Sequence, residues 1–218
     1  MNKKIVITGA SGMIGSLVLQ KCLENENVSQ VISLVRVESK IEHPKLNELV
    51  ITDFLNYKEL LPKLKEIDVV YYCLGVYTGT VKKEKFIEIT VDYPFQLGKL
   101  IAKQSVNCHF CLLSGQGADR TEKSKVLFAK QKGAVENKLS SLEFKSFFAL
   151  RPAYIYPVIK RKEPNISYTI FRILYPLIRL ISPKFTITSI QLANAMYRIG
   201  IEGYHKEILE NIDLLEIS

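Results

Sequence analysis

The chain has 218 residues, a formal net charge of +8, 47% hydrophobic residues and 24% charged residues. These values are typical of one soluble globular domain and exclude a disordered or fibrous protein. The positive charge would suit an anionic ligand, a nucleic acid or a membrane surface. Because it is spread along the chain, and no winged helix, finger or aromatic RNA-binding motif accompanies it, we expect no nucleic-acid partner.

The cysteines do not indicate a disulfide scaffold or a metal site. There are four, at positions 22, 73, 108 and 111. Cys108 and Cys111 have the spacing of a redox or zinc pair, but no second Cys/His pair completes a zinc site. They also enter an apolar strand, in which residues three apart point to opposite faces. We therefore expect two core residues and no metal.

No segment of the sequence is typical of a signal peptide or a membrane span. The first apolar run is only four residues long and ends at Thr8, which is too short for a signal-peptide core. The longest apolar region, 166–181, is interrupted by Arg172, Pro176 and Arg179. We expect a cytoplasmic protein without an integral membrane segment.

Apolar runs of strand length alternate with segments of helical period along the first two thirds of the chain. In chain order we expect a strand at 5–7, a helix at 12–25, strands at 31–35 and 49–52, a short helix at 58–65, a strand at 68–73, a helix at 85–105, a strand at 109–113, a helix at 127–142 and a strand at 146–150. This alternation predicts an α/β fold of the Rossmann type, with a doubly wound parallel sheet and helices on both faces.

The pattern changes after Arg151-Pro152, where prolines punctuate an irregular region with one apolar helix. A last helix at 189–199 and a short strand near Ile208 follow. Ligands of such folds bind outside the carboxyl ends of the strands. We therefore expect a single domain, 1–218, in which residues 152–188 form a small substrate region or lid.

A glycine-rich loop joins the first expected strand to the first expected helix. Gly9, Gly12 and Gly15 stand three residues apart, where the chain must turn, approach a pyrophosphate closely and pack the helix on the strand. The start of the helix offers free N–H groups and the positive end of its dipole to phosphates. This context predicts a dinucleotide-binding loop, formed by Gly9, Ser11, Gly12, Met13, Ile14 and Gly15.

The end of the second strand favours NADP over NAD. NAD-binding proteins usually place an acidic residue there for the ribose 2′-hydroxyl, and this chain has Arg36. A guanidinium can pair with the 2′-phosphate of NADP and stack on adenine. Asp53, just past the third strand, either accepts a hydrogen bond from the adenine amino group or caps a helix.

Several stretches together resemble a known family. They are Thr8–Gly12, Tyr72–Gly75, Leu112–Asp119, Lys132–Glu136 and Leu150–Pro152. The chain is similar to atypical short-chain dehydrogenases/reductases, in the group related to the Tat-interacting protein, over most of its length. The resemblance implies NADP(H) along the sheet edge with nicotinamide near the strands at 109–113 and 146–150. It implies that Leu74 and Gly75 border the cofactor, and it does not give the substrate.

The family's catalytic pattern is incomplete in this chain. In the family, a Tyr-x-x-x-Lys pair on one helix face and a serine at the end of the fifth strand do the chemistry. Lys132 matches the lysine, but Phe128 stands in the tyrosine position and has no proton to give. Ser114 is present, and Gly115 follows where relatives often carry a second serine. The resemblance implies that Lys132 holds the nicotinamide ribose and that Ser114 orients the reacting oxygen.

Two routes around the missing tyrosine stay open. Another hydroxyl, such as that of Tyr154 or Tyr156, could replace it. Alternatively, a flavin or quinone acceptor could take hydride directly. The leading hypothesis is therefore an NADP(H)-dependent oxidoreductase acting on a small, unidentified acceptor. The alternative is a catalytically silent NADP(H)-binding module that contacts a protein partner; a sugar-nucleotide epimerase fits less well, because it generally needs the tyrosine and a larger substrate domain.

Overall fold

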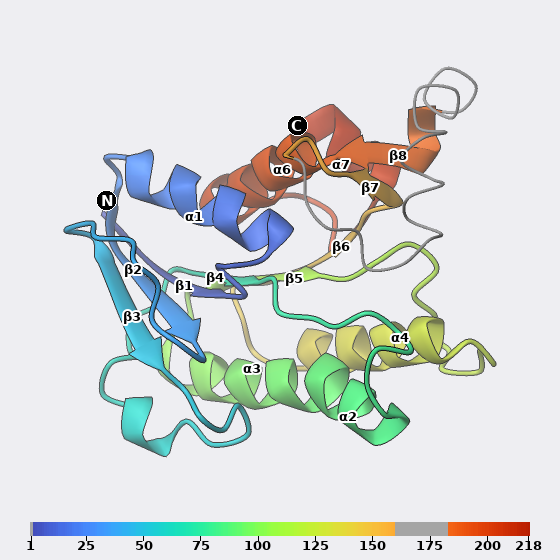
Figure 1. Cartoon of the computed structure of the whole chain (residues 1–218), viewed down its shortest axis with the longest axis horizontal. Coiled ribbons are helices and arrows are strands. Elements are labelled where there is room, and N and C mark those ends of the chain that lie inside the picture. The colour runs from blue at the N-terminus through green and yellow to red at the C-terminus, as the bar shows by residue number, and fades with distance from the viewer. Residues whose placement is uncertain (1, 160–182) are drawn as a thin grey trace.

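A computed structural model describes residues 2–159 and 183–218, which form a three-layer α/β domain (Figure 1). Residues 160–182 lie outside the described part of the chain. Most of the expected lid and the whole apolar region 166–181 therefore lie outside it too. The predicted doubly wound parallel sheet is confirmed, with helices covering both of its faces.

The central sheet has seven strands in the order β3-β2-β1-β4-β5-β6-β9, and every pair is parallel. Their bounds are β1 (Lys3–Thr8), β2 (Val28–Val35), β3 (Leu46–Val50), β4 (Val69–Tyr72), β5 (His109–Leu113), β6 (Ser146–Arg151) and β9 (Ile208–Glu210). The strand order reverses between β1 and β4, where Thr8 pairs with Leu34 on one side and Tyr72 on the other. Ligands of open α/β sheets bind at such a reversal.

Two groups of helices sandwich the sheet (Figure 1). One face carries α1 (Met13–Glu24), α6 (Ser189–Glu202) and α7 (Asn211–Ile217). The other carries α2 (Lys83–Ile87), the π-helical turn η2 (Glu88–Asp92), α3 (Tyr93–Gln104) and α4 (Leu127–Ser140). Side chains alternate along β1 accordingly, with Ile5 and Ile7 packed in the α1/α6 core and Val6 in the core of the opposite face.

Several expected elements have different bounds in the structure. β3 spans Leu46–Val50 instead of 49–52, because it is an edge strand with only Leu49 buried and lacks a continuous apolar run. The expected helix at 58–65 is a single 3₁₀ turn, η1 (Lys58–Leu60). The helix expected at 85–105 starts at Lys83 and contains the π-helical turn.

Four short elements in the C-terminal third of the chain were not expected. β7 (Tyr154–Tyr156) and β8 (Thr186–Thr188) form a parallel pair, η3 (Pro183–Phe185) precedes β8, and α7 follows β9. The buried Asn211 side chain accepts from Ala153 N at 2.9 Å and donates to the carbonyls of Lys184 and Thr186. One amide thus fixes both described ends of region 152–188, a role that no local sequence pattern indicates.

The cysteines behave as core residues. Cys108 and Cys111 are fully buried in the cores on opposite faces of the sheet, as predicted, and all four thiols are free. Burial raises the pKa of both side chains above the ordinary thiol value. Among the residues the structure describes, no group of three or more His, Cys, Asp or Glu side chains could hold a metal ion. Likewise, no described helix has the length and apolar character needed to cross a membrane.

Candidate functional site

The glycine loop between β1 and α1 leaves no room for side chains at two positions. Gly9 has a left-handed φ of +70°, and a Cβ there would lie 2.8 Å from backbone atoms of Cys73 and Leu74, just past β4. A Cβ on Gly15 would lie 2.1 Å from the Gly9 carbonyl oxygen. The loop is therefore clamped between the end of β4 and the first turn of α1, at the reversal of strand order.

The first turn of α1 presents unused backbone donors. Gly12 is the N-cap residue, and no side chain in the described ranges caps the helix. The first four N–H groups of any helix lack partners within it. Here Gly12 N donates to the Gly9 carbonyl at 2.9 Å and Ser16 N makes the first intrahelical bond, to the Gly12 carbonyl at 3.0 Å. The N–H groups of Met13, Ile14 and Gly15 make no bond to backbone outside the helix in the described ranges. Donors and helix dipole fit the pyrophosphate of a dinucleotide, and the glycine cradle gives it room.

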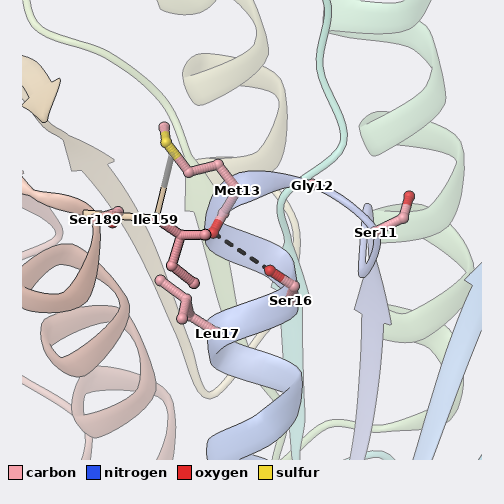
Figure 2. Close-up of a pocket in the computed structure, with 7 residues that line it drawn as sticks. All are labelled: Ser11, Gly12, Met13, Ser16, Leu17, Ile159 and Ser189. Atoms are coloured by element: carbon pink, nitrogen blue, oxygen red, sulfur yellow. Dashed lines mark hydrogen bonds between the residues drawn. The ribbon is translucent and has the colours of Figure 1, made fainter. Parts of the chain in front are cut away.

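A cavity of about 390 Å³ adjoins this helix terminus (Figure 2). Its lining comes from the glycine loop, the first turns of α1 and α6, and the segment after β7: Ser11, Gly12, Met13, Ser16, Leu17, Ile159 and Ser189. Met13 and Leu17 give it an apolar wall, while Ser11 points away on the other side of the loop (Figure 2). The phosphate loop and the first described segment of the expected lid thus share one cavity.

The other residues expected to border the cofactor are Arg36, Asp53, Leu74 and Gly75. Arg36 follows β2 directly, is exposed, and makes no hydrogen bond or ion pair with any residue in 2–159 or 183–218. Asp53 is exposed, and its Oδ1 accepts from Leu55 N at 2.8 Å, so one oxygen caps a turn. Leu74 is partly buried and packs against the core on the α3 side of the sheet. Gly75 is exposed, and a Cβ there would meet nothing within 4 Å.

Lys132 reaches the end of β5 from α4. Its Nζ donates to the Leu113 carbonyl oxygen at 2.9 Å. The side chain is partly buried, and this burial lowers the pKa of Lys132 to about 8, although the nearby Glu136 carboxylate acts in the opposite direction. The amine can therefore change protonation state close to neutral pH.

Phe128 and Gly115, which both depart from the family pattern, are in contact. A Cβ on Gly115 would lie 2.6 Å from Phe128 Cζ, the tip of the ring, and 3.3 Å from Cε1. The phenyl ring thus occupies the space that a side chain at position 115 would need. The two departures are sterically coupled, since the ring position requires glycine beneath it.

Ser114 belongs to a buried network that sequence reasoning missed. Its Oγ donates to Glu136, whose side chain is fully buried on α4. Arg120 Nε and Arg151 Nη2 lie 3.1 and 2.6 Å from Glu136 Oε2. A carboxylate four residues after Lys132 and an arginine ending β6 were visible in the sequence, but only the fold brings them together.

The two alternative hydroxyls lie on β7. Tyr154 and Tyr156 are partly buried and pair with Thr186 and Thr188 of β8 in the register of the small sheet. The structure therefore places both tyrosines in the first described segment of the expected lid, and not on α4 with Lys132 and Phe128.

Comparison with known proteins identifies the family of the chain. Residues 5–126 match the NAD dependent epimerase/dehydratase family. Protein HTATIP2 of Rattus norvegicus is 31% identical over 156 residues, which are 71% of this chain and 63% of that protein. A mitochondrial protein FMP52 of Lodderomyces elongisporus is 26% identical over 168 residues, 71% of this chain and 68% of that protein. The matches thus span about two thirds of these relatives.

Solved structures share the fold. A short chain dehydrogenase/reductase of Saccharomyces cerevisiae superposes with a TM-score of 0.71 at 15% identity and covers 99% of both chains. The Bordetella bronchiseptica enzyme WbmF, solved with NAD⁺, gives 0.69 at 12% identity over 99% of this chain and 77% of that one. At such identities the likeness shows the fold alone.

Proposed function

The chain belongs to the NAD dependent epimerase/dehydratase family, and its likeness to atypical short-chain dehydrogenases/reductases is confirmed; on this premise we propose that it is an NADP(H)-dependent oxidoreductase acting on a small acceptor. The observation that carries the proposal is the phosphate loop. There is no room for a side chain at position 9 or 15, and the uncapped start of α1 adjoins the cavity described above, at the reversal of strand order.

The loop residues would hold the adenosine half of the cofactor. Gly9, Ser11, Gly12, Met13, Ile14 and Gly15 would surround the pyrophosphate, whereas Asp53, Leu74 and Gly75 would border the adenosine. Arg36 would pair with the 2′-phosphate, and its exposure and lack of a partner in the described part of the chain support this role. NADP is accordingly our proposal over NAD.

Lys132 and Ser114 would serve the nicotinamide end. NADP(H), when bound, supplies or takes up the hydride. Lys132 Nζ uses one hydrogen on Leu113 O and has others left for the ribose hydroxyls. Ser114 donates its only hydroxyl hydrogen to Glu136, so it can accept from a reacting group but cannot donate to one while that bond lasts. We propose that Ser114 orients the site mainly through this bond.

The acceptor site would lie beyond the end of β5, with β7 and β8 as the described borders of the lid 152–188. Phe128 offers that site a ring without a hydroxyl. A flavin, a quinone and a carbonyl compound are the acceptor classes that this arrangement admits. We also propose a cytoplasmic location; the FMP52 relatives carry "mitochondrial" in their names, so fractionation is the deciding experiment.

The experiment is a screen that follows NADPH consumption by the purified chain with FMN, a benzoquinone and an aromatic aldehyde. Turnover with one class, lost in a Lys132→Ala variant that still binds NADPH, supports the proposal. Lys103→Ala, at an exposed lysine in the last turn of α3, serves as the matched control for loss of a lysine charge. Binding without turnover in any class would overturn the oxidoreductase assignment in favour of a silent NADP(H)-binding module.

A further inference from the structure

Three side chains border the carboxyl end of β5, and they differ in whether they can release a proton there. Phe128, with its ring tip over Gly115, carries no exchangeable hydrogen. Ser114 donates its hydroxyl hydrogen into the protein, to Glu136. Lys132 is the third, and it reaches the same strand end from α4. Of these three, only Lys132 keeps a hydrogen that it can release.

The placement of Lys132 suits such a role. Phe128 and Lys132 are four residues apart on α4 and therefore lie on the same helix face, one turn apart. Phe128 reaches Gly115 and Lys132 reaches Leu113, so the ring and the amine border the same end of β5. The bond to Leu113 O uses one hydrogen of an ammonium group that has three, and two remain.

Resting on the proposed function, we propose that Lys132 Nζ is the proton donor of the reductive reaction, in place of the absent tyrosine hydroxyl. For a carbonyl acceptor, the carbon gains the hydride while the C=O π electron pair moves to the oxygen. That oxygen takes a proton from the Lys132 ammonium, and solvent then returns a proton to the neutral amine. The cofactor is oxidised and the carbonyl is reduced to an alcohol, so atoms and electrons balance.

The surroundings of Lys132 tune this donor. A lysine with an ordinary pKa of about 10.4 gives up its proton poorly at neutral pH. Burial brings the pKa of Lys132 to about 8, close to the working range of a general acid. Glu136 is the charged group of the described chain that acts on the amine, and it favours the ammonium form.

Glu136 is itself held in place by charges from other elements. Arg120 and Arg151 bind its carboxylate, and they are paired in turn with Glu207 and Glu210. Glu136 also accepts a hydrogen bond from Ser114 Oγ. Ser114 follows Leu113, whose carbonyl oxygen accepts from Lys132. Two side chains of α4, Lys132 and Glu136, thus bind two successive residues at the end of β5. Because both bonds hold α4 against the same strand end, Glu136 is a positioning residue for Lys132.

A direct titration of the amine tests the proposal without any turnover. Cofactor-free protein labelled with ¹³C at lysine Cε is followed by NMR from pH 6 to 11, and the Lys132 signal is assigned by its loss in Lys132→Arg and Lys132→Gln. We expect its midpoint near pH 8, well below the other lysines, and a lower midpoint in Glu136→Gln. A midpoint above pH 10, together with the bulk of the lysines, would overturn the proposal.

Kinetics test the donor role itself. In Lys132→Arg and Lys132→Gln we expect NADPH to bind while kcat for the aldehyde falls at least about 100-fold, the usual range for loss of a general acid. The wild-type kcat should fall above pH 8, and in Glu136→Gln this fall should move to lower pH. Full aldehyde turnover in Lys132→Gln would contradict the donor role. If the wild type shows no turnover with any acceptor, the proposed function fails. The NMR midpoint then tests the lowered pKa of Lys132 independently of turnover.

Discussion

Replacing Gly9 by alanine should weaken the fold by an amount that follows from the geometry of the loop. Alanine at the left-handed φ of +70° costs about 1–2 kcal/mol. Its Cβ would also lie 2.8 Å from backbone atoms of Cys73 and Leu74, which cannot move independently of β4, and overpacking of this kind costs about 1–3 kcal/mol. The free energy of unfolding should therefore fall by about 2–5 kcal/mol.

Urea unfolding followed by circular dichroism measures this change, and Gly75→Ala is the matched control. Gly75 lies near the same sheet edge, but a Cβ there meets nothing within 4 Å, so its stability should stay within about 0.5 kcal/mol of the wild type. NADPH affinity should fall in Gly9→Ala at a temperature where the variant is folded. Equal stability of the two variants would refute the reasoning that the loop is clamped against β4.

Three further changes probe the site around α4. Gly115→Ala should lower the free energy of unfolding by about 1–3 kcal/mol because its Cβ meets the tip of Phe128, and adding Phe128→Leu should recover part of the loss; urea unfolding of both variants decides it. Glu136→Ala should lower the free energy of unfolding by about 3–5 kcal/mol, because it leaves two arginines without their buried partner. Glu207→Ala removes an exposed carboxylate and should lower it by about 0–1 kcal/mol, so comparable losses in the two variants would contradict the buried network. As pH rises from 8 to 10, the free energy of unfolding of the wild type should increase relative to that of Lys132→Met. The reason is that the pKa of Lys132 is about 8 in the folded chain and higher in the unfolded chain, which therefore holds the proton more tightly. A difference in unfolding free energy between the two proteins that stays constant from pH 7 to 10 would contradict the lowered pKa of Lys132.

The sheet and the phosphate loop could be predicted from sequence because each has a local signal. Continuous apolar runs such as 5–7 and 110–113 indicated buried parallel strands, and the glycines indicated the turn into α1. β3, β7 and β8 could not be placed in the same way. An edge strand is half exposed, and strands of three residues are too short to show a period.

The candidate site was predictable to a similar degree. The loop, Arg36 and Lys132 follow from motif and position, but a motif does not give side-chain contacts between elements. The bond from Ser114 to Glu136 and the contact of Phe128 with Gly115 each join residues more than ten positions apart. Sequence reasoning therefore recognised that the family's catalytic pattern was incomplete, whereas only the structure shows which groups fill the space.

The central claim, that the loop and Arg36 bind NADP(H), is tested most directly by calorimetry of the cofactor-free protein with NADPH and NADH. We expect NADPH to bind more tightly, and Arg36→Ala to weaken NADPH about 10- to 100-fold, the effect of losing a charge-assisted contact of about 1.5–3 kcal/mol, while NADH is unaffected. Arg198→Ala, an exposed arginine of α6, should change neither affinity. Failure of both dinucleotides to bind, or an equal loss for both in Arg36→Ala, would contradict the account.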